Sequence, residues 1–279
     1  MGRAMLGLHL CCYPEIVPGI FYFSEDKTMT AFLQQARENV AFVGVCVAVF
    51  AAIFLLAEIL ERLIIRGKRK AWGARYVAFI AMFAAFGGVL MLLEIPLFFA
   101  PGFYKMDLSE LPVLLCGFYL GPVAGVVTEF LKVFIKLLIK GTSTAFVGDF
   151  ANFVVGCTFV LPATAIYHAK KSKRMAIIGM AVGTVCMTTF GSFFNALYLI
   201  PQFSKLFGMP IDVIVGMGTA VNPAIVSVNT LVLFAVVPFN LLKGIVVSIL
   251  TFLLYKRISP ILHKNDAKKL KRLEEKETA

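Results

Sequence analysis

Residues 238–257 read PFNLLKGIVVSILTFLLYKR, an apolar run that ends at two basic residues and is long enough for a membrane-spanning helix. Within this run Asn240 and Lys243 are three residues apart, so on a helix they share one face. A lone ammonium group is costly in hydrocarbon, so this face is expected to line a cavity or to contact a partner inside the protein. The stretch therefore predicts a transmembrane helix that carries part of a binding site.

The composition of the whole chain places it in the membrane. Apolar residues make up 59% of its 279 residues, charged residues only 15%, and the mean hydropathy is +0.87. Soluble domains have roughly 45–50% apolar and 25% charged residues. Apolar runs of about 20 residues recur along the chain, with no polar segment large enough for a second domain. We therefore expect an all-α integral membrane protein with one membrane domain and short tails.

The net charge of +11 comes from basic residues that gather beside the ends of apolar runs. The clusters lie at residues 66–75, at residues 170–174 and from Lys256 onward. Positive residues in short flanking loops mark the cytoplasmic side of a membrane protein, so the clusters orient the helices and do not indicate a nucleic-acid partner. This orientation places Asn240 and Lys243 in the outer half of their helix.

The same orientation divides the chain into seven expected spans. Residues 40–65 form an additional helix before a core of six, and residues 201–237 are too rich in Gly, Pro and Asn for one clean span. The core spans are residues 76–93, 112–120, 124–139, 147–167, 176–200 and 239–255, with a Gly-Pro turn at 121–122. We expect a multi-pass protein of the cell membrane with four regions: an extracellular segment at 1–39, the additional helix at 40–65, a six-helix membrane domain at 76–258 and a cytoplasmic basic tail at 259–279.

The sequence carries no enzymatic motif. The three histidines lie at termini or in loops, and the six cysteines have no metal-ligand spacing. Neither a nucleophile elbow nor a phosphate-binding Gly-rich loop occurs. The chain is therefore not expected to be an enzyme or to hold a metal or cofactor, and any ATPase that drives it must be a separate chain.

Amide side chains inside the expected spans are the first candidates for a binding site. Asn195 and Tyr198 are predicted to share one face near the outer end of the fifth core span, and Asn152 lies near the outer end of the fourth. With Asn240 and Lys243 they project to the outer half of a small bundle. The alternative for Asn195 and Tyr198 is a hydrogen bond between helices, and for Asn152 it is a polar contact at the end of its helix.

A loop that bears Lys105 and Asp107 lies above these side chains. Amides both donate and accept hydrogen bonds, and aromatic faces stack on rings. The predicted site therefore suits an uncharged, polar, flat molecule better than an ion. The aromatic residues expected nearby are Phe98, Phe103, Tyr104 and Tyr198.

Seven short motifs occur in order within residues 76–262. They are LLEIPL at 92–97, KMDLSELP at 105–112, GPVAG at 121–125, GTST at 141–144, ANF at 151–153, NALY at 195–198 and FNLLKG at 239–244. With these motifs the chain resembles the riboflavin-specific substrate-binding component, or S component, of energy-coupling factor (ECF) transporters.

The resemblance implies a six-helix membrane protein that captures riboflavin from outside. It further implies partners: a transmembrane coupling protein and two ATPase subunits. Riboflavin is then the transported ligand and not a cofactor, and the loop around residues 97–107 acts as a lid. Asn195, Asn240 and Lys243 are implied to contact riboflavin, and the full set of residues expected at the ligand is Asn195, Asn240, Lys243, Asn152, Tyr198, Leu97, Tyr104, Lys105 and Asp107.

The family also has an Ala-x-x-x-Ala face on its first core helix, which docks on the coupling protein. Ala81 and Ala85 supply this spacing here. Small residues four positions apart let two helices approach closely. The additional helix at 40–65 and the long segment at 201–237 depart from the family pattern.

Two alternatives stay open at this point. The same fold could take another small vitamin, such as a pyridoxine-like or pantothenate-like molecule. A membrane-embedded enzyme acting on lipid or isoprenoid phosphates would need paired carboxylates or a basic phosphate cradle, and Asp149 and Glu129 are too isolated in the sequence for that.

Glu129, Lys132 and Lys136 form a stripe on the third core span, which we interpret as mutual charge pairing with Lys136 snorkelling to the membrane surface.

Overall fold

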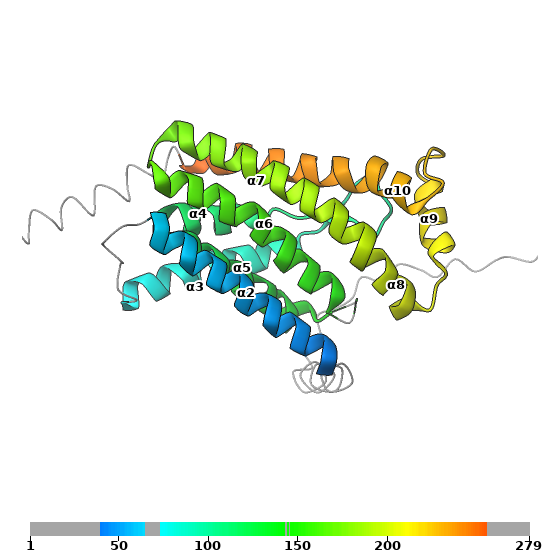
Figure 1. Cartoon of the computed structure of the whole chain (residues 1–279), viewed down its shortest axis with the longest axis horizontal. Coiled ribbons are helices and arrows are strands. Elements are labelled where there is room, and N and C mark those ends of the chain that lie inside the picture. The colour runs from blue at the N-terminus through cyan, green and yellow to red at the C-terminus, as the bar shows by residue number, and fades with distance from the viewer. Residues whose placement is uncertain (1–39, 65–72, 143, 145, 256–279) are drawn as a thin grey trace, which may run out of the picture.

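The computed structural model describes residues 40–64, 73–142, 144 and 146–255. Over these ranges the chain is almost entirely helical, which confirms the expected all-α membrane class (Figure 1). Five of the described helices are long and apolar enough to cross a membrane. The predicted extracellular segment at 1–39 and the basic tail at 259–279 lie outside the described residues.

The helices follow one another as α2 (Val40–Ile64), α3 (Ala74–Leu92), α4 (Glu110–Leu120), α5 (Pro122–Lys140), α6 (Val147–Ala169), α7 (Lys173–Phe194), the π-helical turn η1 (Asn195–Leu199), α8 (Ile200–Phe207), α9 (Ile211–Thr219), α10 (Val228–Leu231) and the π-helical turn η2 (Val232–Val236). α10, η2 and residues 237–255 form one continuous helix, Val228–Tyr255, called the last helix below.

α5 lies at the centre of the bundle, where it packs against α2, α3, α4 and α6 (Figure 1). It carries four charged residues, yet Glu129 and Lys132 are fully buried and Lys136 is only 7% exposed. The expected snorkelling of Lys136 is therefore wrong: its ammonium group stays inside the bundle, where it has a carboxylate partner. The predicted Gly-Pro turn before α5 is confirmed, with Gly121 at a φ of +130° that favours glycine.

Two expected helix ends are wrong, and both lie at a proline. The helix that begins with α7 continues through η1 to Phe207, past Pro201, and the last helix begins at Val228, before Pro238. Each proline follows the end of a π-helical turn by two residues. A proline lacks an N–H donor and crowds the carbonyl one turn back. The wider π turn accommodates this defect, so both helices continue.

The additional N-terminal helix, α2, packs on α5 and α6. The ring of Phe50 lies 4.6 Å from that of Phe130, and Ala57 is fully buried. Near the end of α2, Glu61 Oε2 accepts a hydrogen bond from the Val123 N–H over 3.0 Å. This N–H belongs to the first turn of α5, which has no partner for it within the helix. α2 is thus a fixed seventh helix of the bundle.

The loop between α3 and α4 folds over one end of the bundle. It contains a short antiparallel pair, β1 (Ile95–Pro96) with β2 (Lys105–Met106). Ala100 and Tyr104 from this loop pack into one apolar cluster with residues of α8, α9 and η2. The loop therefore covers the region where the bundle encloses a cavity.

Candidate binding site

A cavity of about 700 Å³ lies beneath this loop. Its walls come from the loop and from α5, α6, η1, α8, α9 and the last helix. Both its size and its mixed lining, with apolar and aromatic side chains around a few polar groups, are typical of small-molecule sites. Seven of the nine residues expected at the ligand line it: Tyr104, Lys105, Asp107, Asn152, Asn195, Asn240 and Lys243.

Leu97 and Tyr198 are not among the residues that line the cavity. The ring of Tyr198 instead stacks on that of Phe194 at 5.1 Å. The prediction that Asn195 and Tyr198 share a face assumed an α-helix, and this assumption was wrong because η1 begins at Asn195. A π turn holds more residues than an α turn, so residues three apart no longer point the same way.

Of the aromatic residues expected near the ligand, some line the cavity and others do not. Phe103 and Tyr104 line the cavity together with Phe239, whose ring lies 5.7 Å from that of Tyr104. Phe98 is 92% exposed and does not reach it. The aromatic lining thus comes from the loop, from the last helix and, through Phe203 and Phe207, from α8.

Two asparagines, Asn195 at the start of η1 and Asn240 four residues after η2, are oriented by hydrogen bonds within their own helices. Asn195 Nδ2 donates to the Gly191 carbonyl over 2.8 Å, and Asn195 Oδ1 accepts from the Tyr104 hydroxyl at 2.8 Å. Asn240 Nδ2 donates to the Val236 carbonyl over 3.1 Å. Among the described residues Asn240 Oδ1 has no hydrogen-bond donor, so it can accept one from a molecule in the cavity.

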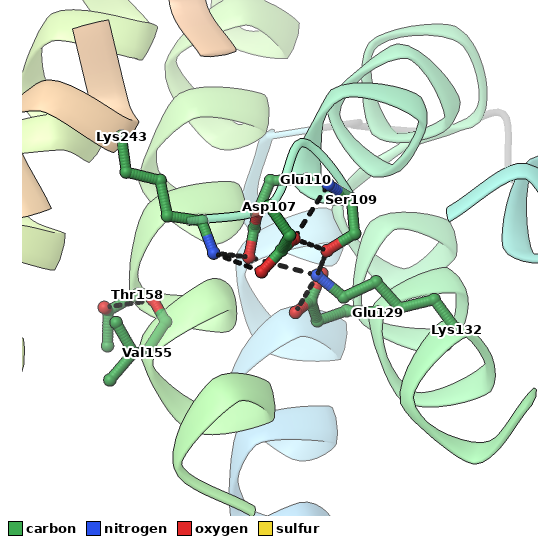
Figure 2. A network of polar contacts seen from close by, with 8 residues as sticks. All are labelled: Asp107, Ser109, Glu110, Glu129, Lys132, Val155, Thr158 and Lys243. Atoms are coloured by element: carbon green, nitrogen blue, oxygen red, sulfur yellow. Dashed lines mark hydrogen bonds and ion pairs between the residues drawn. The ribbon is translucent and has the colours of Figure 1, made fainter. Parts of the chain in front are cut away.

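Lys243 lies in a buried ionic cluster at the base of the cavity (Figure 2). Its Nζ is 3.1 Å from Asp107 Oδ2 and 2.9 Å from Glu110 Oε1. The same Glu110 oxygen is 3.1 Å from Lys132 Nζ, which also lies 2.8 Å from Glu129 Oε1. The predicted pairing of Glu129 with Lys132 is confirmed. Glu129 is nevertheless not isolated, because the fold places it in a cluster of three carboxylates and two ammonium groups.

Asp107 and Tyr104 belong to the covering loop, and burial affects both. Burial alone raises the pKa of Asp107, but the ammonium groups of Lys243 and Lys132 and the hydrogen bonds from Ser109 outweigh it and lower this pKa to about 2. Burial raises the pKa of Tyr104 above its usual value. At neutral pH the loop therefore presents an anionic Asp107 to Lys243 and a protonated Tyr104 to Asn195.

Glu110, Lys136 and Asp149 also line the cavity, although the sequence did not single them out as ligand residues. Lys136 Nζ lies 2.6 Å from Asp149 Oδ1 and donates to the Gly141 carbonyl over 3.2 Å. One sequence signal could have found them. Lys132 and Lys136 are four residues apart on one helical face, and two buried ammonium groups require carboxylates from neighbouring elements.

Some hydrogen-bond acceptors of the residues around the cavity lack a donor. Three buried acceptor atoms of lining residues have no hydrogen-bond partner: Glu110 Oε2, Asp149 Oδ2 and Asn152 Oδ1. Buried polar atoms are almost always satisfied in folded proteins, so these point to a ligand that supplies hydrogen-bond donors. Within the described part of the chain, no group of three His, Cys, Asp or Glu residues could hold a metal ion.

The six core helices match a known family. A family model described as "ECF transporter, substrate-specific component" matches residues 75–255. The chain belongs to the ECF transporter S components. This S component is therefore a multi-pass membrane protein that serves in a transporter and is not an enzyme, and membership implies that it works with an ECF module. α2 lies outside the matched residues.

Individual relatives agree with the family model. The S component is 35% identical over 183 residues to "Riboflavin transporter RibU" of Staphylococcus aureus (strain TCH60), a match that covers 66% of this chain and 89% of the relative. It is 28% identical over 182 residues to "Riboflavin transporter FmnP" of Bacillus subtilis (strain 168), covering 65% and 90%. A solved structure described as "Structure and mechanism of the S component of a bacterial ECF transporter" superposes with a TM-score of 0.53 at 33% identity, covering 67% of this chain and 97% of that one.

Proposed function

We propose that this S component binds riboflavin from the outer side of the cell membrane and delivers it inward when an ECF module is coupled to it. The cavity carries the proposal, because it combines an aromatic wall with hydrogen-bond acceptors that lack donors. Riboflavin offers a flat ring system, an imide N–H between two carbonyls, and a chain with several hydroxyl groups. The relatives that are named riboflavin transporters support the same ligand.

We assign complementary roles to the residues of the cavity. Asn240 Oδ1 accepts the imide N–H, and Lys243 donates its remaining N–H to a ring carbonyl, since an ammonium group has three donors and two of them face carboxylates. Tyr104 and Phe239 flank the ring. The acceptors of Asp149 and Asn152 suit the hydroxyl groups.

Inward delivery needs energy from another chain, because this sequence has no nucleotide-binding motif. A transmembrane coupling protein with two ATPase subunits supplies it under this proposal. Ala81 and Ala85 are exposed on α3, and Ala78 continues the same line of small residues. α2 packs on α5 and α6, so α3 keeps this exposed face for the coupling protein.

Titration of the purified chain with riboflavin tests the proposal. We expect saturable quenching of fluorescence at one ligand per chain, flavin absorbance in protein purified from riboflavin-containing cells, and no ATP hydrolysis. Pyridoxine and pantothenate should not displace the flavin. Absence of a saturable signal in both detergent and lipid would overturn the proposal, and displacement by pyridoxine or pantothenate would favour the other vitamin.

A further inference from the structure

Lys132 lies behind the cavity, and it is not one of the residues that line it. Its side chain is fully buried, and its Nζ is surrounded by oxygen atoms of three residues (Figure 2). Glu129 Oε1 lies at 2.8 Å, Glu110 Oε1 at 3.1 Å and Ser109 Oγ at 2.8 Å. Burying an ammonium group is costly unless carboxylates pair with it. The Lys132 ammonium is therefore held firmly among these oxygen atoms.

Both carboxylates that hold Lys243 are themselves held by Lys132. Glu110 touches the two ammonium groups through the same oxygen, Oε1. Asp107 is reached indirectly, because Ser109 Oγ accepts from Lys132 Nζ and donates to Asp107 Oδ1. Lys132 therefore fixes, from the side away from the ligand, the two groups that fix Lys243.

The charge balance makes this support necessary. The cluster has three carboxylates and two ammonium groups, all buried. Without Lys132, the Lys243 ammonium would face three carboxylates alone, Glu110 would lose one of its two ammonium contacts, and Glu129 would lose its contact with Lys132. A buried carboxylate left without its partner is strongly unfavourable, so the side chains would rearrange.

We propose that Lys132 is a positioning residue for ligand binding, which acts through Glu110 and Ser109 on Lys243. This inference rests on the proposed binding of riboflavin. Lys132→Met should weaken riboflavin binding by about tenfold or more, the loss expected when a charged hydrogen-bonding group in the site is misplaced.

A double-mutant cycle separates positioning from a general loss of stability. Because Lys132 acts partly through Glu110 and partly through Ser109, the double variant Lys132→Met with Glu110→Gln should bind less weakly than the product of the two single losses. In the control cycle with Asn240→Leu, which Lys132 does not touch, the two losses should multiply. Losses that multiply in the Glu110 cycle as well would overturn the proposal.

Two neighbouring glycines of α3 provide a test that leaves every charge in place, should Lys132→Met fail to fold. A Cβ at Gly87 would lie 3.1 Å from Lys132 Cβ and 3.4 Å from the Ser109 carbonyl oxygen. A Cβ at Gly88 would lie 2.6 Å from Ile135 Cγ2, a more severe clash with an apolar side chain. Both substitutions overpack the contact between α3 and α5, but only the first presses on the Lys132 side chain; a Cβ at Gly88 would lie at an ordinary contact distance of 3.5 Å from the Lys132 carbonyl oxygen.

Gly88→Ala should therefore lower the melting temperature more, and Gly87→Ala should weaken riboflavin binding more, by about threefold to tenfold. Riboflavin affinity that simply follows stability across the two variants would overturn the positioning role. If the parent chain itself fails to bind riboflavin, the proposed function fails instead. The titration of the parent thus distinguishes the two failures.

Discussion

The Tyr104 hydroxyl donates a hydrogen bond to Asn195 Oδ1 over 2.8 Å and so joins the covering loop to η1, 91 residues further along the chain. Asn195 is held from the other side by its own bond to the Gly191 carbonyl. The loop and the π turn are therefore fixed to each other at the wall of the cavity.

Removing this hydroxyl should loosen the loop over the ligand. Tyr104→Phe leaves a buried acceptor without its donor, and we expect riboflavin to bind about fivefold to thirtyfold more weakly, corresponding to roughly 1–2 kcal/mol. The loss should lie mainly in faster dissociation, measured by stopped-flow fluorescence. Tyr198→Phe is the matched control. Tyr198 does not line the cavity, so this variant should bind riboflavin as tightly as the parent does. Equal affinity in both variants would exclude a role for the Tyr104 hydroxyl.

Asn240 and Lys243 should each contribute directly to affinity. Asn240→Leu and Lys243→Met leave ligand groups unpaired, at about 1–3 kcal/mol each, so titration should show riboflavin binding weaker by about tenfold to a hundredfold. Asn229→Leu offers a control on the same helix, because Asn229 is exposed and away from the cavity. If both site variants bind as tightly as the parent, riboflavin binds elsewhere.

Transport, but not binding, should depend on the exposed alanines of α3. A tryptophan at position 81 or 85 prevents close helix contact, and overpacking typically costs about 1–3 kcal/mol. Ala81→Trp and Ala85→Trp should keep the parent affinity for riboflavin while abolishing uptake and co-purification with the coupling protein.

A control for these variants is Ala52→Trp on the exposed face of α2, which should leave both uptake and co-purification intact. If uptake persists in the α3 variants, or is lost only in the α2 variant, the coupling protein docks on a helix other than α3.

Glu61 should stabilise the bundle without affecting the ligand. Its carboxylate accepts the Val123 N–H at the positive end of α5, an interaction worth about 0.5–2 kcal/mol in other helix caps. Glu61→Ala should lower the melting temperature and leave riboflavin affinity unchanged. Glu58→Ala is the control: Glu58 pairs with Arg62 one turn further along α2, where the Arg62 side chain is 68% exposed, and helical pairs of this spacing contribute only about 0.3–0.5 kcal/mol. Equal melting temperatures for the two variants would argue against an anchoring role for Glu61.

The ion pair between Asp107 and Lys243 should lose its contribution to folding stability only in strong acid. The pKa of this carboxyl falls from its ordinary 3.8 to about 2 in the folded chain, so the unfolded state binds more protons between these values. The contribution of Asp107 to stability is therefore complete above pH 3.8 and is lost as the pH falls toward about 2. Thermal unfolding of the parent and of Asp107→Asn should differ by a constant amount near neutral pH. The difference should shrink in strong acid, and a difference that shrinks already near neutral pH would contradict this assignment.

Much of the site could be predicted because its signals are local. Asn240 and Lys243 share a helical face because they are three residues apart. The same spacing predicts the ion pair between Glu129 and Lys132. The run of motifs from residue 92 to residue 244 indicated the family, which the family model confirms.

What the sequence by itself determined is the class of the protein, the number of core helices and, where a helix is regularly α-helical, the face on which a polar residue lies, because hydropathy and helical period act within one segment. Only the tertiary structure decided which faces meet. It brought Glu110 to Lys243, placed Asp149 beside Lys136, removed Tyr198 from the cavity through a π turn and set α2 against α5. A buried charge selects its partner from whatever element packs against it, so the partners of Lys132, Lys136 and Lys243 exist only once the helices have assembled.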